Sequence, residues 1–202
     1  MLVLGLTGSI GMGKTTAAGM LRRMGCGVCD SDAVVHRLFA RGGAGAAAVA
    51  KLFPDCLKEG AVDRGKLGAR VFGDSAALRQ LEKAVHPLVQ AAQRRFLAQA
   101  RRCGLKVAVL DIPLLYETKA ERRVDGVLVV SCPAFLQRRR VLARPGMTAE
   151  KLMAVLARQT PDAEKRRRAD VVIPTGRGRG VTWRALRRAL RRLREKDGRH
   201  HA

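Results

Sequence analysis

The chain has 202 residues, 47% of them hydrophobic, which is typical of one globular domain or of one core with a small inserted lobe. No run of 18 apolar residues occurs, so the sequence predicts no membrane-spanning helix. The formal net charge is +23, which favours polyanionic partners such as nucleotides, phosphate-rich cofactors, nucleic acids or an acidic membrane surface without choosing among them.

The first quarter of the chain alternates short apolar runs with helical patterns, and glycines separate them. In chain order, the expected elements are a strand at 2–6, a glycine-rich loop, a helix at 15–24, a strand at 28–29, a helix at 33–40, and an alanine-rich helix that follows a break at 42–45 and ends at Phe53. The next segment, 54–73, is polar and rich in turn residues, so we expect no long element there.

The remaining part of the chain shows the same alternation of apolar runs and helical patterns. In chain order, we expect helices at 75–85 and 88–102 around His86-Pro87, strands at 105–111 and 126–131, helices at 133–143 and 148–158, a strand at 171–173, and a final helix around Trp183, Leu186, Leu190 and Leu193. Apolar strands that alternate with helices predict an α/β fold, in which a parallel sheet is covered by helices on both sides. Only the residues from Asp197 onward are expected to form a loose tail.

Five cysteines are present. Their odd number and irregular spacing argue against a disulfide framework and favour a reducing cytoplasm. Cys26 and Cys29 form one Cys-x-x-Cys pair, for which burial beside a strand is the favoured interpretation, while a redox role stays open.

The clearest motif follows the first predicted strand. Its residues match G-x-x-x-x-G-K-[ST] in full, and they are Gly8, Ser9, Ile10, Gly11, Met12, Gly13, Lys14 and Thr15. Such a loop wraps its backbone N–H groups around phosphates, and the helix that begins after it adds its dipole. Lys14 is expected to reach the β- and γ-phosphates of ATP, and the Thr15 hydroxyl to hold Mg²⁺. Thr16 completes the expected phosphate-binding segment.

Acidic residues follow two predicted strands at the edge where α/β sheets bind ligands. Asp32 could cap the next helix, but beside a phosphate loop the favoured role is to orient or deprotonate an attacking hydroxyl; for Asp30 the two roles are evenly balanced. Asp111 ends a buried strand and is expected to serve Mg²⁺. Glu117 is either a substrate contact or a solvated loop acid.

Arg140 and Arg144 are four residues apart on a basic predicted helix, so they share one face. An arginine from a mobile helix can neutralise charge on a phosphoryl group during transfer. The neighbouring arginines are expected to form a solvated basic face.

Together these motifs resemble the dephospho-coenzyme A kinase family, and the likeness runs from residue 1 to about 176. The motifs that carry it lie at 6–16, 30–32, 85–88, 111–117, 140–144, 158–159 and 169–173. The resemblance implies one P-loop kinase domain over 1–202, with a helical substrate lobe at about 56–102, a basic helical lid at about 135–168, and a basic C-terminal helix and tail at 177–202.

The resemblance also implies a reaction, namely ATP-dependent phosphorylation of the ribose 3′-hydroxyl of dephospho-coenzyme A, the last step of coenzyme A synthesis. By position, Asp32 faces the acceptor hydroxyl, Arg140 is the lid arginine, and His86 lies in the substrate lobe. Two segments depart from the family pattern: Pro174-Thr175-Gly176 replaces a loop that usually contains Asn-Gly, and Pro145-Gly146 replaces polar lid residues.

Two other interpretations stay open. The chain could be a different P-loop metabolite kinase, such as a nucleoside monophosphate or shikimate kinase, although the Asp-Ser-Asp and Pro-Leu-Leu-Tyr-Glu motifs argue against this. It could also be a nucleic-acid-binding ATPase or a plain RNA-binding protein, but no nucleic-acid-binding motif is found, and aromatic residues for base stacking make up only 3% of the chain. The expected partners are ATP and dephospho-coenzyme A, with non-specific nucleic acid possible through the basic C-terminus, and the expected state is a monomer or weak homo-oligomer.

Overall fold

The structure is a computed structural model that describes residues 1–200, with side chains up to Lys196. The chain forms two compact units. The first combines residues 1–29 with the segment from residue 100 onward, and the second comprises residues 30–99.

The first unit contains the strands of the main sheet and the helices that follow them. Its elements are β1 (Leu2–Thr7), α1 (Lys14–Arg23), β2 (Gly27–Asp30), β5 (Val107–Asp111), η2 (Ala120–Arg123), β6 (Gly126–Ser131), α6 (Ala134–Leu142), α7 (Ala149–Ala157), α8 (Asp162–Arg168), β7 (Val171–Pro174) and α9 (Arg179–His200).

The main sheet has five strands in the order β2-β5-β1-β6-β7. β1 is parallel to both β5 and β6, and β6 is parallel to β7. Leu6 is paired with Asp111, so the carboxyl ends of β1 and β5 meet at one edge of the sheet. This register brings the loop after β1 next to the acid at the end of β5.

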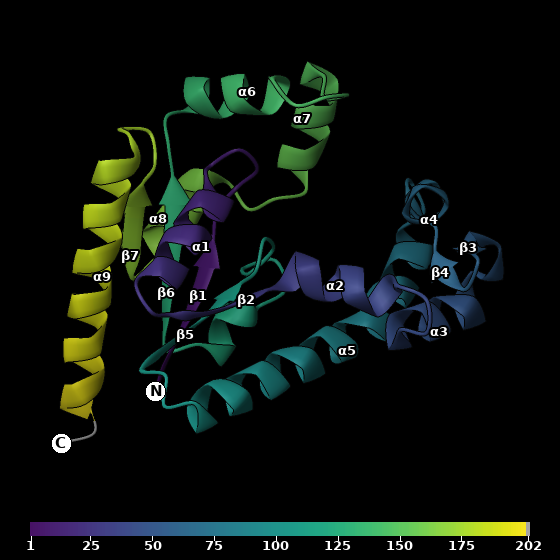
Figure 1. Cartoon of the computed structure of the whole chain (residues 1–202). Coiled ribbons are helices and arrows are strands. Elements are labelled where there is room, and N and C mark those ends of the chain that lie inside the picture. Colours follow the sequence, from purple (N-terminus) through teal and green to yellow (C-terminus); the bar gives the residue numbers. More distant parts are fainter. Residues whose placement is uncertain (201–202) are drawn as a thin grey trace. The chain divides into compact units, whose positions relative to one another are not determined.

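Helices and connecting segments cover both faces of this sheet. Leu4 and Leu6 are fully buried in a core with Leu21 of α1 and Leu186 of α9, and Figure 1 shows α9 running beside β7. Gly5 faces the opposite side, toward Leu115. The predicted α/β fold with a helix-covered parallel sheet is therefore confirmed.

The second unit is helical, with a small hairpin. Its elements are α2 (Ser31–Phe39), α3 (Ala44–Leu52), η1 (Pro54–Cys56), β3 (Leu57–Lys58), β4 (Ala61–Val62), α4 (Arg64–Val71) and most of α5 (Ser75–Arg102). Buried Phe39, Val49, Phe53 and Leu67 form its core. This unit includes most of the predicted substrate lobe and begins earlier in the chain.

The predicted break at His86-Pro87 is wrong, because α5 is one helix of 28 residues with Pro87 inside it. A proline within a helix costs about 3 kcal/mol because it removes one hydrogen bond and crowds the preceding turn. Burial outweighs this cost here, since Val85 and Val89, on either side of Pro87, pack against the core of the second unit.

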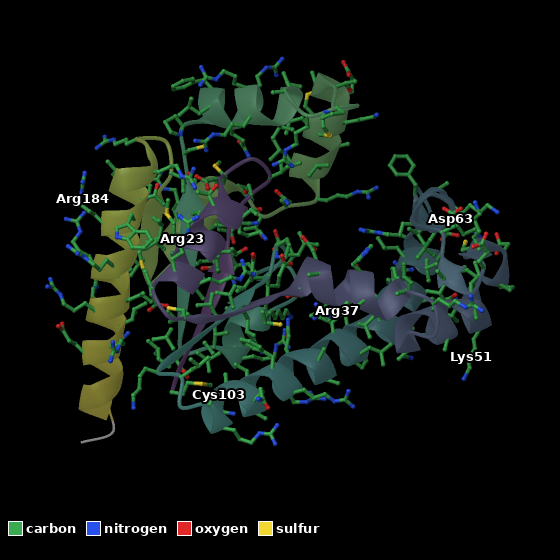
Figure 2. The ribbon with its side chains drawn as sticks, in the orientation of Figure 1. Arg23, Arg37, Lys51, Asp63, Cys103 and Arg184 are labelled. Carbon is green, nitrogen blue, oxygen red and sulfur yellow. The ribbon has the colours of Figure 1, made fainter. Side chains whose placement is uncertain are left out.

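Other differences concern short or highly charged segments. The polar segment 54–73 contains the β3–β4 hairpin and α4, whose N-cap is Asp63 (Figure 2). Residues 162–168, where the sequence predicts no separate helix, form α8. The predicted tail is helical as far as His200, and residues 201–202 lie outside the described part of the chain.

Two further predictions concern membrane-spanning helices and the Cys-x-x-Cys pair. No helix among the described residues is both long and apolar enough to cross a membrane. Cys26 and Cys29 are both buried, as the favoured interpretation of the Cys-x-x-Cys pair requires.

Candidate active site

The loop between β1 and α1 has the backbone of an anion site. Gly11 and Gly13 have φ values of 78° and 86°, in the left-handed region that glycine adopts readily. Helix α1 begins at Lys14, with no side-chain cap and no acidic residue in its first turn. Its N-terminal N–H groups are therefore available to an anion such as a phosphate.

The same glycines are crowded. A Cβ on Gly11 would lie 2.5 Å from Val141 Cγ2 and 3.1 Å from the Gln137 carbonyl oxygen. A Cβ on Gly13 would lie 3.2 Å from Thr175 Cβ. The loop thus needs glycine both for its backbone conformation and for its close approach to neighbouring segments.

We expect Gly11→Ala to raise the KM for ATP by at least about tenfold, because the loop must shift away from α6 to accommodate the methyl group. Gly25→Ala is the matched control. Gly25 also has a positive φ, 81°, but a Cβ there would meet nothing within 4 Å, so only backbone strain of about 1–2 kcal/mol is expected. Steady-state kinetics and thermal unfolding separate the two effects, and equal KM values for both variants would contradict the crowding argument.

Lys14 and Asp111 form an ion pair at the edge of the sheet. Lys14 Nζ lies 2.6 Å from Asp111 Oδ1, and the side chains are 17% and 3% exposed. The predicted phosphate-binding lysine and the predicted Mg²⁺ acid therefore lie in direct contact. The phosphates of ATP are negatively charged, so they can replace the Asp111 carboxylate as the ion-pair partner of Lys14.

The oxygen donors at this edge fit Mg²⁺. Magnesium prefers hard oxygen ligands and is commonly held by one or two carboxylates or hydroxyls together with phosphates and water. Asp111 provides a carboxylate, and Thr15 provides an exposed hydroxyl in the first turn of α1. The residues present thus match the chemistry that the phosphate-loop motif predicts.

Residues from α6 and from the segment after α7 contact the loop. Gln137 Nε2 donates to the Ile10 carbonyl oxygen at 2.8 Å, and Gln159 Oε1 accepts from the Ile10 N–H at 3.1 Å. Arg140 Nη2 donates to the Thr175 carbonyl oxygen at 2.8 Å, and its Nη1 lies 3.5 Å from the Gly11 carbonyl oxygen. Arg140 is thus brought to the phosphate loop.

The segment after β7 also contacts the loop. Thr175 Oγ1 donates to the Met12 carbonyl oxygen at 2.6 Å and lies 3.2 Å from the Ser131 carbonyl oxygen. Sequence reasoning saw Pro174-Thr175-Gly176 only as a departure from a family pattern. In the structure, the Thr175 hydroxyl of this segment links the end of β6 to the phosphate loop.

Comparisons with known proteins agree on one family. The family model described as dephospho-CoA kinase matches residues 2–178. A dephospho-CoA kinase of Paramagnetospirillum magneticum is 64% identical over 166 residues, 82% of this chain and 78% of its own length. One from Rhodospirillum rubrum is 55% identical over 94% of this chain and 90% of its own length. The chain belongs to the dephospho-CoA kinase family.

Solved structures give the same picture of the fold. A crystal structure from Thermus thermophilus is 34% identical, with a TM-score of 0.78 over 94% of this chain and 95% of that one. A dephospho-CoA kinase from Campylobacter jejuni has a TM-score of 0.63 at 23% identity, over 95% and 96% of the two chains. As a member of the dephospho-CoA kinase family, this chain is a kinase and hence a transferase.

In this dephospho-CoA kinase family member, the remaining predicted site residues belong to the second unit or to the region around α8. Asp30 is the N-cap of α2, since its Oδ1 accepts from the N–H groups of Asp32 and Ala33 at 2.9 and 3.1 Å. Asp32 lies in the first turn of that helix and is exposed. The cap is thus Asp30 and not Asp32, and the role of Asp32 stays a prediction. His86 lies exposed on α5.

Glu117 makes a buried ion pair. Its Oε1 accepts from the Thr160 N–H at 2.7 Å and lies 3.0 Å from Lys165 Nζ, and the Lys165 side chain is 0% exposed. Burial alone would raise the pKa of Glu117, but hydrogen bonds from its own N–H and that of Thr160, together with the Lys165 ammonium, hold the pKa below its ordinary value. Glu117 is therefore not a solvated loop acid.

Sequence reasoning assigned no role to several residues that contact the phosphate loop, among them Gln137, Gln159 and Thr175. Gln159 was part of a quoted motif, Arg158-Gln159, but that motif suggested no role. Neutral side chains give no charge signal in a sequence, so only the fold could show their contacts.

Proposed function

We propose that this chain transfers the γ-phosphoryl group of ATP to the 3′-hydroxyl of the dephospho-coenzyme A ribose, giving coenzyme A and ADP. The observation that carries the proposal is the contact between Lys14 and Asp111 beside an uncapped α1 N-terminus. In a member of the dephospho-CoA kinase family, this contact supplies the charged part of a phosphoryl-transfer site.

In the proposed reaction, the acceptor oxygen attacks the γ-phosphorus in line, the bond from that phosphorus to the β–γ bridging oxygen breaks, and ADP leaves. Lys14 and the loop N–H groups neutralise charge on the β- and γ-phosphates. Thr15 and Asp111 would hold Mg²⁺, which supplies further positive charge to the phosphates when bound. Arg140, which contacts the loop at Gly11, neutralises charge on the transferred group.

The proposed acceptor base is Asp32, which takes the proton of the attacking hydroxyl. Support for this role is that Asp30 caps α2, so the Asp32 carboxylate does not serve as the cap. We place His86 in the acceptor-binding lobe, as the family resemblance implies. Glu117 Oε1 is already engaged by Thr160 and Lys165, and its other oxygen is buried, so a contact between Glu117 and the acceptor stays a prediction from the sequence.

We expect Asp32→Asn to lower kcat by at least about 10²-fold, because general-base catalysis contributes typically 10²–10⁴-fold. The KM for ATP should change little, since the loop that binds ATP is untouched. Asp55→Asn is the control, because it removes an exposed carboxylate from the same unit. A kcat within threefold of wild type in Asp32→Asn would rule out the proposed base.

The position of the new phosphate tests the reaction itself. ATP labelled at the γ-phosphate is incubated with dephospho-coenzyme A and Mg²⁺, and the product is examined by ³¹P NMR and mass spectrometry. A label on the ribose 3′-oxygen supports the proposal, and a label elsewhere or free phosphate alone contradicts it. Loss of turnover on chelation of Mg²⁺ tests the proposed cofactor.

Three broader expectations accompany this proposal. The arginines of α9 from Arg179 to Arg194 are exposed, and Figure 2 shows Arg184 projecting from that helix; non-specific binding of nucleic acid there stays a prediction. A monomer or weak homo-oligomer in the cytoplasm also stays a prediction.

A further inference from the structure

At one residue of the phosphate loop, Ile10, both backbone polar groups are held from outside the loop. Both backbone polar groups of Ile10 bond to glutamine side chains, the carbonyl to Gln137 at 2.8 Å and the N–H to Gln159 at 3.1 Å. Gln137 lies on α6, and Gln159 follows α7. Two elements distant in sequence thus fix the orientation of the same residue, immediately before the left-handed Gly11.

Gln159 is itself held in place. Its N–H donates to the Leu156 carbonyl oxygen at 3.1 Å, which closes the last turn after α7. The next N–H, of Thr160, donates to Glu117 Oε1 at 2.7 Å, and Glu117 is paired with the fully buried Lys165. The backbone that carries the Gln159 carboxamide is therefore fixed by hydrogen bonds at Gln159 and at Thr160.

The oxygen of Gln159 that accepts from Ile10 carries no net charge. Oε1 of a glutamine is a neutral acceptor, and it bonds to an N–H of a loop built to surround phosphates. A carboxylate could accept the same hydrogen bond, but its negative charge would repel a polyphosphate bound by the same loop. A neutral acceptor can orient the loop without opposing the nucleotide.

We propose that Gln159 is a positioning residue for ATP, which orients the Ile10 peptide beside the bound polyphosphate through an acceptor that must be uncharged. Glu117 and Lys165 support it by fixing the backbone at Thr160. The proposal rests on the proposed function, in which this loop binds ATP, and it adds a residue to which neither the motif nor the family resemblance assigned a role.

Two substitutions separate orientation from charge. Gln159→Met keeps the length of the side chain and removes the acceptor, and we expect ATP to bind about tenfold more weakly, as for loss of one hydrogen bond. Gln159→Glu keeps an acceptor oxygen and adds a charge. We expect its loss of affinity to exceed that of Gln159→Met and to shrink as salt is raised from 0.05 to about 0.5 M, because salt screens the repulsion.

The measurement is ATP affinity by calorimetry at both salt concentrations, with steady-state kinetics and thermal unfolding of each variant. The KM for ATP should rise while kcat at saturating ATP changes less than about threefold, as expected for an effect on nucleotide binding. Gln80→Glu is the matched control, since it makes the same change at an exposed position of α5 in the second unit; it should bind ATP like wild type.

Failure of the Gln159 proposal and failure of the proposed function give different results. Wild-type affinity in both Gln159 variants, or equal losses in both without a salt effect, would overturn the proposal and leave the proposed function intact. Failure of the wild-type protein to bind ATP would instead count against the proposed function.

Discussion

Replacing Lys14 with methionine should lower kcat by about 10³-fold. The lysine ammonium is the charge in direct contact with Asp111 at 2.6 Å, at the start of α1. In the proposed reaction it neutralises phosphate oxygens as the γ-phosphoryl group is transferred, and one such preorganised contact is worth about 10²–10³ in rate. Lys106→Met is the matched control, because Lys106 is an exposed lysine just before β5, at the opposite edge of the sheet.

A second substitution separates the catalytic effect from the structural one. Lys14→Met removes the cation that lies 2.6 Å from the Asp111 carboxylate, whose side chain is 3% exposed, and loss of a close positive charge beside a buried carboxylate destabilises the fold. Adding Asp111→Asn should therefore restore stability but not activity, as measured by thermal unfolding and kcat. A Lys14→Met enzyme with near-normal kcat would show that Lys14 is not the phosphate-binding lysine.

The second large effect concerns stability. Glu117→Ala should lower the free energy of unfolding by about 3–5 kcal/mol, because it leaves the fully buried Lys165 ammonium without a counter-charge. Glu164→Ala is the control. Glu164 pairs with Arg168 at 3.2 Å on the surface of α8, and an exposed pair of this kind contributes about 0.3–0.5 kcal/mol.

A double substitution tests the cause. Replacing the pair by Glu117→Leu and Lys165→Met should recover most of the stability, since an apolar pair requires no charge compensation. The loss should also depend on pH. The lowered pKa of Glu117 means that its contribution is present above its ordinary pKa of 4.5 and disappears as pH falls through the lower folded value. Urea unfolding that gave equal losses for Glu117→Ala and Glu164→Ala would contradict the buried-pair interpretation.

The elements that could be predicted from the sequence are those whose signal is local. The apolar runs at β1, β5 and β6 identify buried parallel strands, and the glycine-rich motif identifies the loop and the start of α1. The position of Asp111 at the carboxyl end of a buried strand could be predicted as well, and its role toward Mg²⁺ stays a prediction. Its pairing with Lys14 follows from the parallel register of β1 and β5.

The other features of the fold and of the candidate site depend on tertiary contacts. Pro87 suggests a break, but packing of α5 on both sides of it maintains the helix. Lys165 lies in the most basic part of the chain, and nothing local shows that it is the charged side chain buried against Glu117. Arg140 and Arg144 share a sequence pattern, yet Arg140 contacts the loop while Arg144 is exposed.

The most direct test of the central claim is ADP release in the presence of ATP and Mg²⁺, with dephospho-coenzyme A compared against AMP, adenosine, shikimate and RNA as acceptors. We expect turnover with dephospho-coenzyme A at a kcat/KM far above that for any other acceptor. Turnover with a different small acceptor, or hydrolysis stimulated by RNA without a phosphorylated product, would contradict the proposed reaction.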